Sequence, residues 1–185
     1  MSLPCYKLSI DLSGAFVNGF VERILTEKNP LKFIDIKNAE YFNQDWVDKI
    51  LNQYRLPIIG AEVFYRSRNE QFDIHMDSTR DPDRLPSAAF NIVLHGGKES
   101  SMIWYAMPNE KPTLDRYVNP YWKWNKTVKF IEIYRDSVTE FSILRIDLPH
   151  AIENTEERVC VSFRVPRDFF ESWEQAVEYV KPYIV

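Results

Sequence analysis

The sequence predicts one mainly β domain of the sandwich or jelly-roll class, with helices flanking the strands at both ends. Two observations carry this prediction. The chain holds 185 residues, of which 45% are hydrophobic and 15% aromatic, enough for one packed core. From residue 58 onward, short segments rich in alternating apolar residues are separated by turn residues, as in all-β folds. These segments are 59–67, 71–77, 88–95, 101–106, 127–134, 141–147 and 158–165.

Helical patterns lie outside this strand-rich core. We therefore expect a single domain over 1–185, made of an N-terminal strand and bracing helices (1–57), a β core (58–165) and a C-terminal helix (166–185). The expected flanking elements are a strand over 4–12, a helix over 13–28, a strand over 33–36, a helix over 44–54 and an amphipathic helix over 168–181, with Asp168 as its N-cap.

The segment 71–77 alternates strictly between polar and apolar residues, which places His75 and Asp77 on one face of a strand. Side chains two positions apart start roughly 6.5–7 Å from each other, close enough to converge on one metal ion. A third ligand must then come from a distant strand, and His150 is the candidate. Two histidines and one carboxylate leave the remaining coordination positions open.

The segment after His150 predicts a polar turn over 153–157 and then a second alternating strand. Arg158, Cys160, Ser162 and Arg164 share one face of that strand. Arginine suits a carboxylate because its planar guanidinium donates two parallel hydrogen bonds. Arg158 is our first candidate for such a role and Arg164 the second; Ser162 would add a hydrogen bond. The alternative is an exposed strand face with solvated arginines.

The order His-x-Asp, a long gap, Pro-His and then Asn154, Arg158, Ser162 and Arg164 resembles the iron(II)/2-oxoglutarate-dependent oxygenase superfamily. The resemblance covers residues 65–165, and within the superfamily it is nearest to the aspartyl/asparaginyl β-hydroxylase-like and prolyl-hydroxylase-like branches. It implies a double-stranded β-helix (jelly roll, cupin-like) and a hydroxylase that uses Fe(II), 2-oxoglutarate and O2. His75, Asp77 and His150 would be the iron ligands, and Arg158 would bind the 2-oxoglutarate C5 carboxylate. Arg158 follows His150 by eight positions, a shorter spacing than those branches have, which leaves Arg164 as the other choice.

Three further polar residues are candidates for the same site. Asn91 and Tyr65 each offer a group for the cosubstrate, although either can equally be a structural residue of the sheet. His95 is the remaining histidine and would replace His150 or Asp77 in an all-histidine site; an ordinary residue beside the Gly96-Gly97 turn is its other interpretation. The aromatic segment 108–126 is either a binding loop or a loop packed on its own aromatics.

Two other function classes stay open at this point. One is a non-oxidative cupin-like binding protein for a sugar or another polar ligand. The other is an isomerase or hydrolase that uses zinc or manganese at the same ligands. The substrate of the oxygenase would be a peptide side chain or a small molecule.

Charge and composition exclude several classes of protein. The net charge of −4 disfavours sequence-independent binding of nucleic acid. The two cysteines form no Cys-x-x-Cys motif, and no apolar run approaches the ~20 residues of a membrane span. No glycine-rich phosphate loop or nucleophile elbow occurs. We therefore expect a cytoplasmic protein without membrane or nucleic-acid partners.

Overall fold

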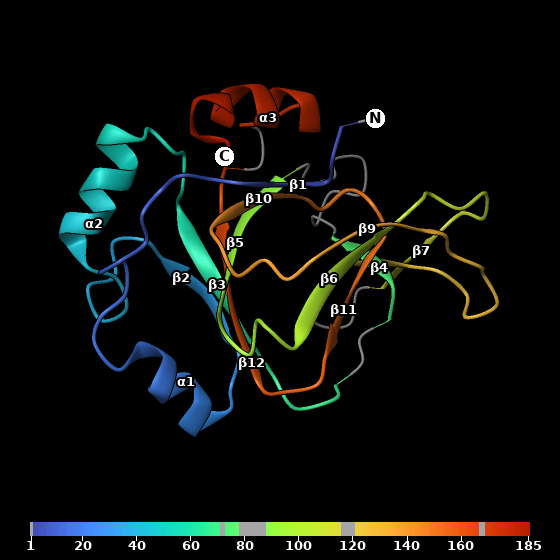
Figure 1. The fold of residues 1–185 in the computed structure, drawn as a ribbon, viewed down its shortest axis with the longest axis horizontal. Helices are drawn as coiled ribbons and strands as arrows, with labels where there is room; N and C mark the ends of the chain where they lie inside the picture. The colour runs from blue at the N-terminus through green and yellow to red at the C-terminus, as the bar shows by residue number, and fades with distance from the viewer. Residues whose placement is uncertain (1, 71–72, 78–87, 116–120, 167–168) are drawn as a thin grey trace.

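The computed structural model describes residues 2–70, 73–77, 88–115, 121–166 and 169–185. Within them the chain forms two antiparallel sheets of six strands each and a few short helices (Figure 1). The predicted mainly β fold with flanking helices is confirmed. Figure 1 shows α1 and α2 beside β2 and β3, whereas the second sheet lies on the other side of the molecule.

The main sheet has the order β1-β10-β5-β12-β3-β2 and the second sheet the order β7-β8-β4-β11-β6-β9. The strands of the main sheet are β1 (Cys5–Lys7), β10 (Ser142–Arg145), β5 (Ala88–His95), β12 (Arg158–Arg164), β3 (Gly60–Arg66) and β2 (Leu31–Asp35). Those of the second sheet are β7 (Thr113–Asp115), β8 (Tyr121–Lys123), β4 (His75–Asp77), β11 (His150–Asn154), β6 (Ser100–Tyr105) and β9 (Glu132–Asp136). Strands far apart in the sequence are therefore neighbours in both sheets.

The helices cover the outer face of the main sheet. Helix α1 (Phe20–Glu27) starts later than the predicted residue 13, because Gly14 and Gly19 adopt left-handed backbone conformations that interrupt a helix. Helix α2 (Gln44–Asp48) continues into a π-helical turn over Lys49–Gln53, in agreement with the predicted helix over 44–54.

The C-terminal helix α3 (Trp173–Val180) is shorter than predicted and is capped by Ser172, whose hydroxyl accepts a hydrogen bond from the Gln175 amide. Asp168, the expected N-cap, lies outside the described residues.

Successive side chains of strand β12 point alternately into two different apolar cores. Val159, Val161 and Phe163 belong to the large apolar core beneath the helices. Cys160 points the other way, into a smaller core that contains Met102 and Trp104 of the second sheet. The face that carries Arg158, Cys160, Ser162 and Arg164 therefore lines the space between the two sheets.

Three strand predictions are wrong. The segment after His150 is the strand β11 and not a turn over 153–157; only residues 155–157 connect it to β12. The expected strand over 127–134 begins only at Glu132. The segment 108–126, expected to be a loop, contributes β7 and β8, which extend the second sheet beside β4. β7 and β8 have three residues each and β9 has five, which is too short for a clear alternating pattern in the sequence.

No helix within the described ranges is long and apolar enough to cross a membrane. Cys5 and Cys160 are both buried as free thiols.

Candidate metal centre

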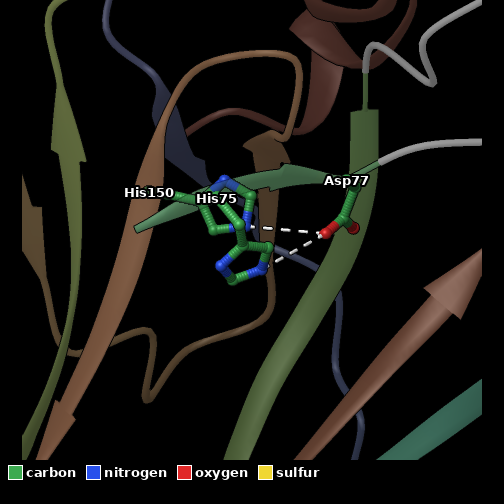
Figure 2. Close-up of side chains that lie close together, drawn as sticks. All are labelled: His75, Asp77 and His150. Atoms are coloured by element: carbon green, nitrogen blue, oxygen red, sulfur yellow. Dashed lines mark ion pairs between the residues drawn. The ribbon is translucent and has the colours of Figure 1, made fainter. Parts of the chain in front are cut away.

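Three side chains predicted as metal ligands meet at one point between the sheets. His75 and Asp77 come from β4, and His150 comes from β11, which pairs with β4 so that His150 lies directly opposite His75. Figure 2 shows both imidazoles directed toward the Asp77 carboxylate. The short strand β4 thus supplies two ligands on one face, and antiparallel pairing supplies the third.

The distances within the triad suit a metal site. Asp77 Oδ1 lies 3.7 Å from His75 Nε2 and 3.6 Å from His150 Nε2. One ligand atom from each of the three residues lies within 4.8 Å of the others. Ligand atoms bound to one ion at about 2.0–2.2 Å lie about 3 Å apart, so small side-chain rotations would close the site. The triad resembles a two-histidine, one-carboxylate site.

Hydrogen bonds fix the orientation of both imidazoles. Nδ1 of His75 lies 2.9 Å from the Asp73 carbonyl oxygen, and Nδ1 of His150 lies 2.9 Å from that of Leu148. A carbonyl oxygen only accepts, so the proton sits on Nδ1 and the lone pair on Nε2, facing Asp77. This outer support is characteristic of metal-bound histidine.

Arg164 holds the other side of the carboxylate. Its Nη1 lies 3.5 Å from Asp77 Oδ2, and its Nη2 lies 2.5 Å from Glu62 Oε2. Asp77 is thereby contacted through Oδ2 by the guanidinium, while Oδ1 faces the two histidines. Arg164 is therefore placed beside the predicted metal ligands, where it orients Asp77.

The pKa values in the triad favour the protonation states that bind metal. Burial, together with the neighbouring His150, lowers the pKa of His75 from 6.5 to about 4. Burial would raise the pKa of Asp77, but the neighbouring His150 and the charge of Arg164 hold it well below its usual range. At neutral pH, His75 is uncharged and Asp77 is ionised, as metal coordination requires.

Arg158 is far from Arg164 along the same strand face. The two are six positions apart, which spans roughly 20 Å at ~3.3 Å per residue. Arg158 is 2% exposed, and its Nε and Nη1 have no hydrogen-bond partner among the described residues. Ser162 is also buried on this face and is paired in register with Asn91, whose Oδ1 is buried without a partner in the described part of the chain.

Two of the predicted site residues lie elsewhere. Tyr65 is paired with Val159 on the helix-covered face, and its hydroxyl donates a hydrogen bond to Glu157, so its expected contact with the cosubstrate is wrong. The reason is parity: Tyr65 is offset by one residue from the inward-facing positions of β3. His95 is exposed at the end of β5, beside Glu157, and is not part of the triad.

Residues that the sequence interpretation missed include Glu62 and Arg66 of β3. Both lie on the inward face, since Glu62 is paired with Ser162 and Arg66 with Arg158. The alternation of side chains within 60–66 could have indicated that these two residues share the inward face. The hairpin of β7 and β8 was missed as well; it places Tyr121 against His75, with ring centroids 5.7 Å apart, and Lys123 in contact with Asp115.

Comparisons with known proteins add little to this geometry. No family model matches the chain, and no curated protein matches it. Among solved structures, the chain is similar to the X-ray structure of E. coli ycfD, with 14% sequence identity, 64% of this chain covered and a TM-score of 0.37. The match spans 30% of that chain. At this level of similarity, the site must be interpreted from its own residues.

Proposed function

We propose that this protein is an Fe(II)- and 2-oxoglutarate-dependent oxygenase, a hydroxylase that acts on a peptide side chain or a small metabolite, on a double-stranded β-helix. The observation that carries the proposal is the buried triad of His75, Asp77 and His150, with both Nε2 atoms facing one carboxylate oxygen. A second feature supports it: a buried arginine, Arg158, lies on the same interior face, and two of its nitrogen atoms lack an acceptor among the described residues.

The donor set fits a ferrous ion. Imidazole nitrogen and carboxylate oxygen are ligands that iron accepts, and three protein ligands leave positions open for small molecules. When bound, iron with 2-oxoglutarate would supply the activation of O2 for attack on a substrate C–H bond. The carbonyl oxygens of Asp73 and Leu148 keep the imidazoles in the binding tautomer.

The remaining residues have distinct tasks in this proposal. Arg164 and Glu62 orient Asp77, so that one carboxylate oxygen is directed at the ion. Arg158 binds the distal carboxylate of 2-oxoglutarate through charge-assisted hydrogen bonds. Ser162 and Asn91, paired in register on the same inner face, provide polar groups between these two arginines.

The test replaces Asp77 with alanine and measures succinate formation from 2-oxoglutarate with Fe(II) and O2. We expect at least a hundredfold loss of succinate, and also loss of the visible charge-transfer band that wild type should show under anaerobic Fe(II) and 2-oxoglutarate. Asp48→Ala, on the exposed surface of α2, is the matched control and should keep both signals.

Three outcomes would contradict the proposal in whole or in part. Full turnover in the Asp77→Ala variant would refute the ligand assignment. Absence of the band in wild type would favour a non-oxidative binding protein. Turnover that requires zinc or manganese but neither O2 nor 2-oxoglutarate would favour an isomerase or a hydrolase.

A further inference from the structure

The hairpin of β7 and β8 extends the face of the second sheet that carries the predicted metal ligands. Lys123 is paired in register with His75, and Tyr121 with Asp77. Residues directly opposite in an antiparallel pair have their side chains on the same face, so Lys123 and Tyr121 share the inner face with the ligands. Asp115 of β7 is paired with Tyr121 and lies on this face as well. Three neighbouring strands therefore carry one continuous polar surface.

An ion pair occupies this surface next to the predicted ligands. Lys123 Nζ lies 2.5 Å from Asp115 Oδ2, and the Tyr121 hydroxyl lies 3.4 Å from the same oxygen. The side chain of Lys123 is 41% exposed and that of Asp115 is 20% exposed. An ion pair that is this open to solvent contributes little to the stability of the fold. Its position beside a predicted metal centre is therefore better explained by ligand binding.

The predicted metal centre is open to solvent on one side. The side chain of Asp77 is 28% exposed, and those of its neighbours Arg164 and Glu62 are open to a similar degree, whereas that of His150 is only 4% exposed. Arg164 and Glu62 form a second ion pair here, on the main sheet. A molecule that approaches the open side of the centre therefore meets paired charges of both signs.

Paired charges of opposite sign suit a zwitterion better than a simple ion. A lone anion at Lys123 would be repelled by Asp115, and a lone cation at Asp115 would be repelled by Lys123. A molecule with an ammonium and a carboxylate on one carbon atom is attracted by both side chains. An ammonium donates three hydrogen bonds and a carboxylate accepts about four, so the ion pair can persist while such a molecule binds.

The spacing of the strands brings this ion pair within reach of the metal ligands. Neighbouring strands lie about 4.8 Å apart, so Lys123 starts one strand from His75 and Asp115 starts two strands from it. An amino acid whose charged head group lay on the hairpin would direct its side chain toward the metal ligands. A residue within a peptide has amides in place of both charges and lacks this complementarity.

We infer that the hairpin of β7 and β8 binds the head group of a free α-amino acid, with the carboxylate at Lys123 and the ammonium at Asp115. The inference rests on the proposed function only where it makes this amino acid the substrate of the oxygenase. It then selects a small molecule over a peptide side chain. The head-group site itself follows from the ion pair and the strand register.

The test measures binding to the full-length, metal-free protein in EDTA at neutral pH, so that it needs neither iron nor turnover. The common protein amino acids are screened one by one by thermal shift. Each one that raises the melting temperature is titrated by calorimetry beside its N-acetyl, amide and N-acetyl amide derivatives. At least one amino acid should bind, about tenfold or more tightly than each derivative, because every derivative lacks one or both charges.

Two variants assign the charges to their side chains. Lys123→Met should weaken binding of that amino acid by about tenfold or more and leave binding of its amide within twofold, because the amide has no carboxylate. Asp115→Asn should likewise weaken the amino acid more than its N-acetyl derivative. Lys126→Met, at an exposed lysine just after β8, is the matched control and should change neither affinity. Circular dichroism verifies folding, and the comparison of ligands on wild type needs no variant.

Each result decides the inference. Amino-acid binding that depends on Lys123, without any succinate formation from 2-oxoglutarate, supports the head-group site and rejects only the proposed function. Faster succinate formation in the presence of the same amino acid supports both. Absence of binding by every amino acid, or equal affinity for an amino acid and its N-acetyl amide, overturns the inference even when turnover with iron is normal. Equal affinity in wild type and Lys123→Met overturns it as well.

Discussion

Arg164 and Arg158 lie at opposite ends of strand β12 and differ in their hydrogen-bond partners. At the metal end, Arg164 contacts two carboxylates, Glu62 and Asp77, and its side chain is 24% exposed. At the other end, Arg158 is almost fully buried and two of its nitrogen atoms have no acceptor among the described residues. Both arginines lie on one face of one strand, so the difference comes from what the neighbouring strands place opposite them.

This difference separates a structural role from a binding role. A paired arginine positions its carboxylate partners, and its own hydrogen-bonding capacity is largely used. A buried arginine with unmet donors imposes a desolvation cost that a bound anion would offset. We therefore propose that Arg164 orients Asp77 and that Arg158 binds a ligand. The predictions that follow test this difference, from the largest expected effect to the smallest.

The largest effect should come from pH at the metal end of the metal-free protein. The pKa of His75 is lowered from 6.5 to about 4, so the unfolded chain takes up a proton first as the pH falls. Stability contributed by neutral His75 is complete above pH 6.5 and is lost as the pH falls toward 4. The loss should be on the order of 3 kcal/mol, at about 1.4 kcal/mol per pKa unit.

Urea unfolding in EDTA across this pH range measures that loss. His75→Gln should show a shallower pH dependence between 6.5 and 4, whereas His95→Gln, at an exposed position, should behave as wild type. An identical slope in His75→Gln and wild type would contradict the assignment of the lowered pKa to His75.

The second-largest effect should come from replacing Asn154, which lies near Arg158. Asn154→Ala removes the two hydrogen bonds that the buried side-chain amide donates to the carbonyl oxygens of Ser67 and Glu156. We expect a loss of about 2 kcal/mol in the free energy of unfolding, and weaker binding of 2-oxoglutarate with unchanged metal affinity. Asn125→Ala, which removes an exposed turn bond to Thr127, is the control and should cost less than about 1 kcal/mol. A larger change in metal affinity than in 2-oxoglutarate affinity would break the proposed separation of the two ends.

The smallest effect should come from Arg164→Met. Loss of the contact with Asp77 should weaken binding of Mn(II) or Co(II) by about tenfold, the lower end of the range for outer-shell residues of metal sites. Stability should change little, because the partly exposed ion pairs of Arg164 are screened by solvent. Arg158→Met should bind both metals as wild type does; equal weakening in both variants would show that the two arginines are not functionally distinct.

Much of this site follows from local alternation in the sequence. Period two placed His75 and Asp77 on one face and Arg158, Ser162 and Arg164 on another, and the structure has both sets as expected. Alternation is determined by the pleat of a single strand, so it needs no knowledge of the partner strand. The mainly β class follows from the same local signal.

The pairing of strands that are distant in sequence decided the other features of the site. Which strand lies beside β4, and in which register, depends on contacts between segments about 75 residues apart, so the sequence could suggest the pairing of His150 with His75 but could not establish it. The same holds for the placement of Arg164 on Asp77, for the outward direction of Tyr65 and for the buried pair of Arg66 and Arg158. The sequence by itself determined which side chains share a strand face; the packing of two sheets decided which faces meet and which charges lack a partner.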